Sequence, residues 1–270
     1  MTIKLIAVDM DGTFLNDNMD YDRARFAQQY ARLKRQGVKF VVASGNQYYQ
    51  LRSFFPQIAD EIAFVAENGA YIVNQNQPVF CAAISSQDYQ RVMTVITALP
   101  GLEIIQCCRD SAYLLASASE AFFNNMQRYY HRLRRVAAFD QVAEPAFKFA
   151  LTLSNERLPD MMRELSRQLA GILCPVSSGH GSIDLILPGM HKANGLKILQ
   201  NLWGIADQDV VAFGDGGNDR EMLRQAGFGF AMENAPEAIK AEARFLTSSN
   251  NQSGVLTVID DIIAQHAPFD

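Results

Sequence analysis

Two aspartates, spaced two positions apart, follow the first apolar run of the chain, residues 3–8. Asp9 and Asp11 come where this run ends, directly before Gly12. Side chains alternate between the two faces of a strand, so these two carboxyl groups point the same way and share one small space. Like charges held so close repel each other and raise one pKa. Either a divalent cation neutralises the pair, or one carboxylate acts as base or nucleophile while the other holds a proton.

Three later segments carry residues that bind phosphate or metal ions in proteins. The apolar run 38–43 ends at Ser44 and Gly45, a helix pattern begins near Lys192, and the run 210–213 leads into a segment with Asp215, Asn218 and Asp219. Taken singly, each has an ordinary structural role: aspartate beside glycine forms turns, serine caps helices, and a lysine at a helix start is solvated. Their occurrence together at the ends of strands is what indicates a site.

Strand and helix patterns alternate in both outer parts of the chain. Residues 21–36 have an apolar helical face, and the strand 38–43 follows. Further strand patterns lie at 62–66, 210–213 and 229–232, with helices beginning near residues 45 and 220. Such alternation predicts an α/β fold with a doubly wound parallel sheet, whose sites lie at the carboxyl ends of the strands.

The middle of the chain departs from this pattern. Helix candidates at 87–99, 120–135 and 158–170 alternate with β-rich runs at 146–153 and 182–187. A stretch of this length is enough for a small α/β layer of its own. We therefore expect a core formed by residues 1–82 and 188–270 and an inserted α/β cap formed by residues 83–187. The polar segment 177–182 predicts a loop that faces the active site.

Composition excludes several classes of protein. Hydrophobic residues make up 49% of the 270 residues and charged residues 20%, as in folded globular proteins. The net charge of -5 argues against nucleic acid as a partner. No apolar run approaches the roughly 20 residues that span a bilayer, so we expect no membrane association and a cytoplasmic location. The four cysteines lack paired spacing, which predicts reduced, mostly buried thiols and no zinc site.

At this point the chain resembles a known family. Four segments look like the four motifs of the haloacid dehalogenase-like phosphatases, in the right order: Asp9-Met10-Asp11-Gly12-Thr13, Ser44-Gly45, Lys192, and residues 214–219. Residues 67–69 and the long insertion after the second motif further resemble the Cof-type branch, which has an α/β cap there. The resemblance covers essentially the whole chain. More narrowly, it resembles enterobacterial Cof-type phosphatases associated with flavin mononucleotide, the ribityl-aminouracil phosphate of riboflavin synthesis, or small sugar phosphates.

The resemblance and the chemistry of the residues imply a Mg2+-dependent phosphomonoester hydrolase. Asp9 is expected to attack phosphorus and form an aspartyl-phosphate, while Asp11 protonates the leaving oxygen and then activates water. Magnesium prefers oxygen ligands, which suits Asp9, the backbone carbonyl of Asp11, and Asp215. Asp219 is expected to orient Lys192 or a metal-bound water. The residues expected to hold the phosphate are Met10, Ser44, Gly45, Lys192 and Asn218.

The substrate is less well determined than the reaction. Cof-type relatives often have arginine after the serine-glycine pair, whereas this chain has Asn46, so the preferred leaving group stays open. We expect 5-amino-6-(5-phospho-D-ribitylamino)uracil and flavin mononucleotide, with a broad sugar phosphatase as the alternative. A receiver-like signalling module is too short to match this chain, and a true dehalogenase has no need of Asp11. A binding protein with a dead site is disfavoured because every catalytic position is filled.

Overall fold

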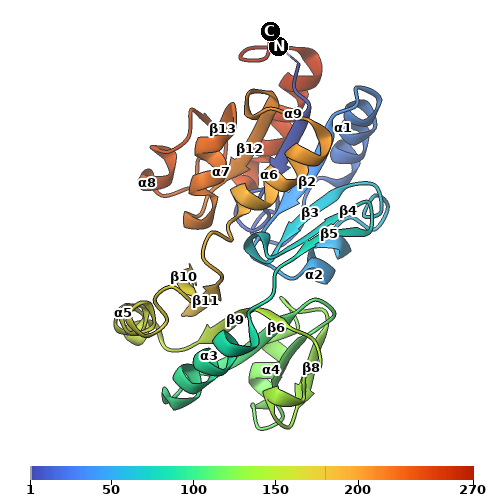
Figure 1. Ribbon diagram of the computed structural model, residues 1–270. Coiled ribbons are helices and arrows are strands. Elements are labelled where there is room, and N and C mark those ends of the chain that lie inside the picture. Colours follow the sequence, from blue (N-terminus) through green and yellow to red (C-terminus); the bar gives the residue numbers. More distant parts are fainter. Residues whose placement is uncertain (1, 180) are drawn as a thin grey trace.

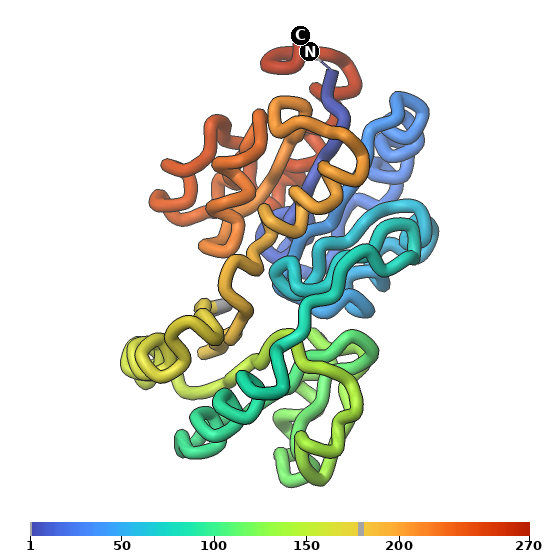
Figure 2. Tube along the Cα trace, viewed as in Figure 1, coloured from blue at the N-terminus to red at the C-terminus, as the bar shows by residue number. Residues whose placement is uncertain are grey.

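The computed structural model of the protein describes residues 2–179 and 181–270, which form two sheets with helices packed on them (Figure 1). The eight-stranded sheet has the order β14-β13-β12-β1-β2-β3-β4-β5, and the six-stranded sheet has the order β10-β11-β9-β6-β7-β8. We call the first sheet with its helices the core, and the second with α3, α4 and α5 the cap. The chain passes between them near residues 82 and 188 (Figure 2). The cap boundaries 83 and 187 stay a prediction.

The core sheet is parallel from β14 to β3, as predicted, and two antiparallel strands extend it. Its central strands β13, β12, β1 and β3 are buried on both faces because their alternating apolar side chains pack against different helices. Ile6 and Val8 face α1, α2 and α9, whereas Leu5 and Ala7 face α6 and α7. The sheet is therefore doubly wound. Its strands are β1 (Leu5–Val8), β2 (Lys39–Ala43), β3 (Ala63–Ala66), β4 (Tyr71–Asn74), β5 (Gln77–Cys81), β12 (Val210–Gly214), β13 (Phe228–Met232) and β14 (Phe245–Thr247).

Two of the core helices, α1 and α6, begin at residues whose side chains cap the first turn. Asp22 accepts a hydrogen bond from the Arg25 backbone at the start of α1, and the His191 ring accepts one from the Asn194 backbone at the start of α6. His191 is thus a capping residue. The helices are α1 (Arg23–Arg35), α2 (Tyr48–Ser53), α6 (Lys192–Trp203), α7 (Arg220–Gln225), α8 (Glu237–Lys240) and α9 (Gly254–Ala264).

The cap sheet has one face covered by helices and one face turned to the core. Phe149 and Leu151 pack against α3 and α5, whereas Phe147 and Ala150 belong to a cluster continuous with the core. The cap therefore lies over the core with a largely buried junction. Its elements are α3 (Ser86–Ala98), β6 (Glu103–Cys108), β7 (Ala112–Leu115), α4 (Glu120–Met126), β8 (Leu133–Val136), β9 (Ala146–Thr152), α5 (Leu158–Gln168), β10 (Cys174–Gly179) and β11 (Ser182–Ile186).

Two local predictions are wrong, and one strand of the core was not predicted. The helix expected over 120–135 ends at Met126, because residues 133–136 pair as β8 with β7. Most of the loop expected over 177–182 is the β10–β11 hairpin, although residue 180 lies outside the described residues. Strand β13 is followed by a further strand, β14.

The cysteines and the helices bear on two of the predictions from composition. Cys107 and Cys108 are buried, whereas Cys81 and Cys174 are exposed, so the prediction of mostly buried thiols holds for half of them; all four are free thiols. No helix in the described ranges, 2–179 and 181–270, is both long and apolar enough to cross a membrane.

Candidate active site

The order β12-β1-β2 brings three of the predicted site segments to one edge of the core sheet. Val8 pairs with Val42 on one side and with Phe213 on the other, so all three strands end at the same level. The first residues after these three strands are Asp9, Ser44 and Asp215. Parallel strands point their carboxyl ends the same way, and this register alone gathers the acids and the hydroxyl.

Lys192 joins two of the acids from the start of α6. Its Nζ donates to Asp9 Oδ1 at 2.6 Å and to Asp219 Oδ1 at 2.7 Å, and its side chain is fully buried. Burial alone would lower the pKa of this ammonium, but the charges of Asp219 and Asp9 outweigh it and raise the pKa. Lys192 therefore stays charged, and it fixes the position of Asp9.

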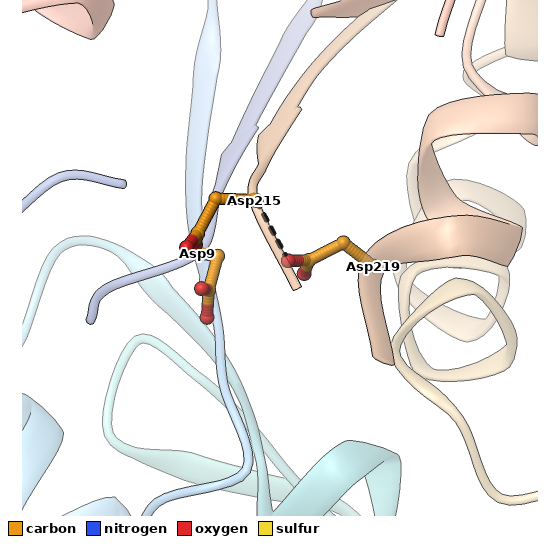
Figure 3. Close-up of side chains that lie close together, drawn as sticks. All are labelled: Asp9, Asp215 and Asp219. Atoms are coloured by element: carbon orange, nitrogen blue, oxygen red, sulfur yellow. Dashed lines mark hydrogen bonds between the residues drawn. The ribbon is translucent and has the colours of Figure 1, made fainter. Parts of the chain in front are cut away.

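Asp219 has both of its oxygens engaged within the protein. Oδ1 accepts from Lys192, and Oδ2 accepts from the backbone N–H groups of Asp215 at 3.0 Å and Gly216 at 2.8 Å. Figure 3 shows this carboxylate beside Asp9 and Asp215, with the bond from Asp215 drawn. A carboxylate saturated in this way is suited to orienting its neighbours rather than to binding a metal ion itself.

The acidic cluster carries more negative charge than the protein compensates. Carboxyl oxygens of Asp9, Asp215 and Asp219 lie within 4.8 Å of one another. Burial, followed by the charges of Asp219 and Asp215, raises the pKa of Asp9 well above its usual value, and burial likewise raises that of Asp215. Three carboxylates beside one ammonium leave about two uncompensated charges, which fits a divalent cation with oxygen ligands.

The loop after β1 is shaped to hold Asp215 in place. The Thr13 hydroxyl donates to Asp215 Oδ1 at 2.8 Å. Gly12 adopts a left-handed φ of 73°, and a Cβ there would lie 2.4 Å from Asp215 Oδ2, so this position needs glycine. Met10 is fully buried, and its carbonyl accepts the N–H groups of Thr13 and Leu15, so any contact that it makes with phosphate must come from its backbone.

Asp11 lies at the outer side of the site and is exposed to solvent. Asn46 Nδ2 donates to Asp11 Oδ2 at 2.6 Å, joining the carboxylate expected to act as acid and base to the segment after Ser44. Asn46 thus has a partner in the position where an arginine is often found in Cof-type relatives. Ser44 is not the cap of α2, since that position belongs to Gln47.

A second loop, residues 67–69, forms backbone hydrogen bonds with the Ser44 segment. Glu67 and Asn68 adopt positive φ values of 53° and 56°, and Gly69 one of 93°. Left-handed conformations cost non-glycine residues about 1–2 kcal/mol each. Here they let Asn68 N–H donate to the Ser44 carbonyl and Glu67 N–H donate to the Asn46 carbonyl. Strained, buried backbone of this kind gathers at functional sites.

Comparison with known proteins now places this geometry in a family. The model of the haloacid dehalogenase-like hydrolases matches residues 6–259. The chain belongs to this family. The predictions of an α/β fold of this family and of a hydrolase are therefore confirmed.

The relatives of this haloacid dehalogenase-like hydrolase include named phosphatases. The 5-amino-6-(5-phospho-D-ribitylamino)uracil phosphatase YbjI of Escherichia coli is 54% identical over 270 residues, which is the whole of both chains. A phosphatase of the same description from Bacillus subtilis, YitU, is 26% identical over 93% of this chain and 94% of its own. A crystal structure from Streptococcus mutans has 37% identity and a TM-score of 0.91, and covers 97% of this chain and 100% of that one.

Two cap residues of this hydrolase reach the site although the sequence reasoning did not single them out. Lys148 on β9 and Asp184 on β11 are buried against the core, where Lys148 Nζ lies 2.5 Å from Glu67 Oε2 and 3.0 Å from the Gly45 carbonyl. Asp184 Oδ2 accepts from Asn68 Nδ2 at 3.3 Å. The sequence offers one signal that these residues are unusual. In residues 147–149 and 183–185, a charged residue lies between two apolar residues of a strand.

Proposed function

We propose that this phosphomonoester hydrolase acts on 5-amino-6-(5-phospho-D-ribitylamino)uracil and releases inorganic phosphate from it. The single observation that carries the substrate is the 54% identity to YbjI across the whole length of both chains. At this identity the cap and the core are shared in full, so the surfaces that contact both ends of a substrate are related. Further support comes from YitU, another relative with this name.

In the proposed reaction, Asp9 is the nucleophile. Its carboxylate attacks phosphorus, the bond from phosphorus to the ribityl oxygen breaks, and Asp11 gives a proton to the leaving oxygen. Water then attacks the aspartyl-phosphate, Asp11 takes back a proton, and phosphate leaves with Asp9 restored. The hydrogen bond from Lys192 to Asp9 Oδ1 supports this assignment, because it orients the carboxylate and stabilises its ionised form.

The phosphate oxygens are assigned to groups around Asp9. We place them against Lys192, the Ser44 hydroxyl, the backbone N–H of Gly45, the backbone of Met10 and the Asn218 amide. Asn218 Nδ2 already donates to Asn68 Oδ1 at 3.1 Å, which leaves its second hydrogen free for the substrate. Asp219 keeps Lys192 in place through the 2.7 Å ion pair.

The excess negative charge of the acidic cluster supports Mg2+ as the cofactor. Asp9, the Asp11 carbonyl and Asp215 would hold the ion, while the oxygens of Asp219 are already taken. When bound, Mg2+ would neutralise charge on the phosphate and on the two carboxylates. The predicted cytoplasmic location is also part of this proposal, and cell fractionation tests it.

Phosphate release from a panel of substrates tests the function. The panel holds 5-amino-6-(5-phospho-D-ribitylamino)uracil, flavin mononucleotide, a hexose phosphate, pyridoxal phosphate and an aryl phosphate, each with Mg2+ and with chelator. We expect Mg2+-dependent release, with kcat/KM for the ribityl-aminouracil phosphate at least about tenfold above the others. A flavin or sugar phosphate in first place would overturn the substrate, and release unaffected by chelator would overturn the cofactor.

A further inference from the structure

A second buried lysine lies at the junction between cap and core. Lys148 is 1% exposed and comes from the cap strand β9. Burial by itself would lower the pKa of its ammonium, yet the charges of Asp184 and Glu67 raise it well above the usual value. The group is therefore a charge buried between two layers that have no covalent link at this point. Burying an ammonium is costly unless its partners compensate the lost hydration, so the groups that Lys148 contacts indicate its role.

Besides Glu67, Lys148 contacts the core loop that carries Ser44. Its Nζ donates to the Gly45 carbonyl at 3.0 Å. The carbonyls on either side, those of Ser44 and Asn46, accept from the backbone of Asn68 and Glu67. All three consecutive carbonyls are thus fixed, two by the core itself and the middle one by the cap.

The bond from Lys148 acts on Ser44 through one peptide group. The Gly45 carbonyl and the Asn46 N–H belong to the same peptide, and that N–H donates to Ser44 Oγ at 3.1 Å. A cation on the carbonyl polarises the peptide and strengthens the donation from its N–H. Because Ser44 Oγ accepts there, its own hydroxyl hydrogen is left to donate to another acceptor, which we assign to the phosphate.

Asp184 reaches the other phosphate-holding side chain by a parallel path. Its Oδ2 lies 3.4 Å from Lys148 Nζ and accepts from Asn68 Nδ2 at 3.3 Å. This turns the oxygen of the Asn68 amide toward Asn218, whose Nδ2 donates to it at 3.1 Å. The cap therefore contacts the catalytic loop through one buried core amide.

We propose that Lys148 and Asp184 are positioning residues for phosphate binding, so that seating of the cap completes the phosphate site. Lys148 orients Ser44 through the Gly45–Asn46 peptide, and Asp184 orients Asn218 through Asn68. This rests on the proposed function, in which Ser44 and Asn218 hold the phosphate. The alternative role for such a cap lysine is recognition of the organic part of one substrate. A positioning role predicts weaker inhibition by inorganic phosphate when Lys148 is replaced, whereas the alternative predicts unchanged inhibition.

The test compares Lys148→Met with the wild-type enzyme on three phosphomonoesters that have different leaving groups, and measures inhibition by inorganic phosphate. We expect kcat/KM to fall about 10- to 100-fold by a similar factor for all three, the range found when groups supporting a ligand are removed. The inhibition constant of inorganic phosphate should rise at least about tenfold, because phosphate has no leaving group. Loss confined to one ester, with phosphate inhibition unchanged, would overturn the proposal.

Two control variants separate positioning from loss of stability. Phe149→Leu changes the next residue of β9, whose side chain packs on the outer side of the cap, and Lys197→Met removes a lysine paired with Asp207 away from the site. Both should keep kcat/KM and phosphate inhibition within about twofold of wild type. If Phe149→Leu weakens phosphate inhibition as much as Lys148→Met does, the effect is one of cap stability and the proposal fails.

A double variant covers the case in which Lys148→Met does not fold. Lys148→Met with Glu67→Gln keeps the net charge of the buried cluster while removing the same donor, and it should show the same uniform loss. A double variant with wild-type phosphate inhibition would contradict the proposal. An inactive wild-type enzyme would overturn the proposed function and this inference with it, whereas an active wild type with an unaffected Lys148 variant overturns the inference alone.

Discussion

Lys192 and Lys148 are two versions of one arrangement, a buried ammonium between two carboxylates. Lys192 lies between Asp9 and Asp219, and all three belong to the core. Lys148 lies between Asp184, which like itself comes from the cap, and Glu67 of the core. In both cases the carboxylates raise the pKa of the lysine despite its burial.

The difference lies in which contacts a rigid-body movement of the cap would break. The bonds of Lys192 to Asp9 and Asp219 lie within the core and would survive such a movement, so Asp9, the proposed nucleophile, would keep its orientation. The bonds from Lys148 to Glu67 and Gly45 cross the junction and would break together. In our proposal, the nucleophile Asp9 is therefore oriented whatever the position of the cap, whereas the phosphate site is complete only when the cap is seated.

The largest expected effect comes from the core side of the comparison. Asp9→Asn should lower kcat by about 10⁴-fold or more while leaving the fold intact, because the amide cannot form the aspartyl-phosphate. Steady-state kinetics with Mg2+ and a circular dichroism spectrum measure the two parts. Mg2+-dependent turnover that survives in this variant would sink the assignment of Asp9.

Lys192→Met should come next. We expect kcat to fall by about 10²–10³-fold, because a charged donor to the nucleophile and the phosphate is lost. Stability should fall as well, since two buried carboxylates lose their cation, and breaking a buried pair costs about 3–5 kcal/mol. Thermal melting with and without Mg2+ measures this. A variant as stable as wild type in chelator would show that the acids do not depend on the lysine.

Asn46→Ala should have a smaller effect, confined to Asp11. The lost 2.6 Å hydrogen bond orients the proposed acid and base, so we expect kcat to fall about tenfold with KM little changed. Asn201→Ala, on the exposed side of α6, is the matched control and should behave as wild type. A rise in KM without a change in kcat would instead assign Asn46 to substrate binding.

The smallest effect is a dependence of stability on pH. Burial raises the pKa of Asp215 above 3.8, so its contribution is present below pH 3.8 and is lost as pH rises through the higher folded value. In chelator, Asp215→Asn should therefore gain stability relative to wild type between pH 4 and pH 7, and Mg2+ should abolish this gain. Denaturant unfolding at several pH values measures it.

Asp207→Asn provides a control of opposite sign. Hydrogen bonds from Gln200 and Lys197 outweigh burial and lower the pKa of Asp207, so its stabilising contribution is lost as pH falls. This variant should be less stable than wild type above pH 3.8, and the difference should shrink as pH falls below that value. If the stability relative to wild type changes with pH in the same direction for Asp215→Asn and Asp207→Asn, repulsion between the acids of the cluster does not destabilise the fold.

The elements of the core could be predicted from the sequence more completely than the contacts between cap and core. Strands β1, β2 and β12 were predictable because each is an apolar run that ends in a polar residue of a known motif. The helix predicted over 120–135 failed because pairing of β8 with β7, a tertiary contact, overrides a helical pattern. The charge between two phenylalanines marks Lys148 as unusual for a strand, but its partners could not be predicted, since they are distant in sequence and only the packing of cap on core brings them together.

Residues 67–69 have a consequence for engineering and for the evolution of this enzyme. Glycine at position 67 would relieve the left-handed strain of Glu67, about 1–2 kcal/mol. It would also delete the carboxylate that pairs with the buried Lys148, and breaking a buried ion pair costs about 3–5 kcal/mol. Stability alone therefore retains this strained residue, and design protocols that place glycine wherever φ is positive should exempt residues 67–69.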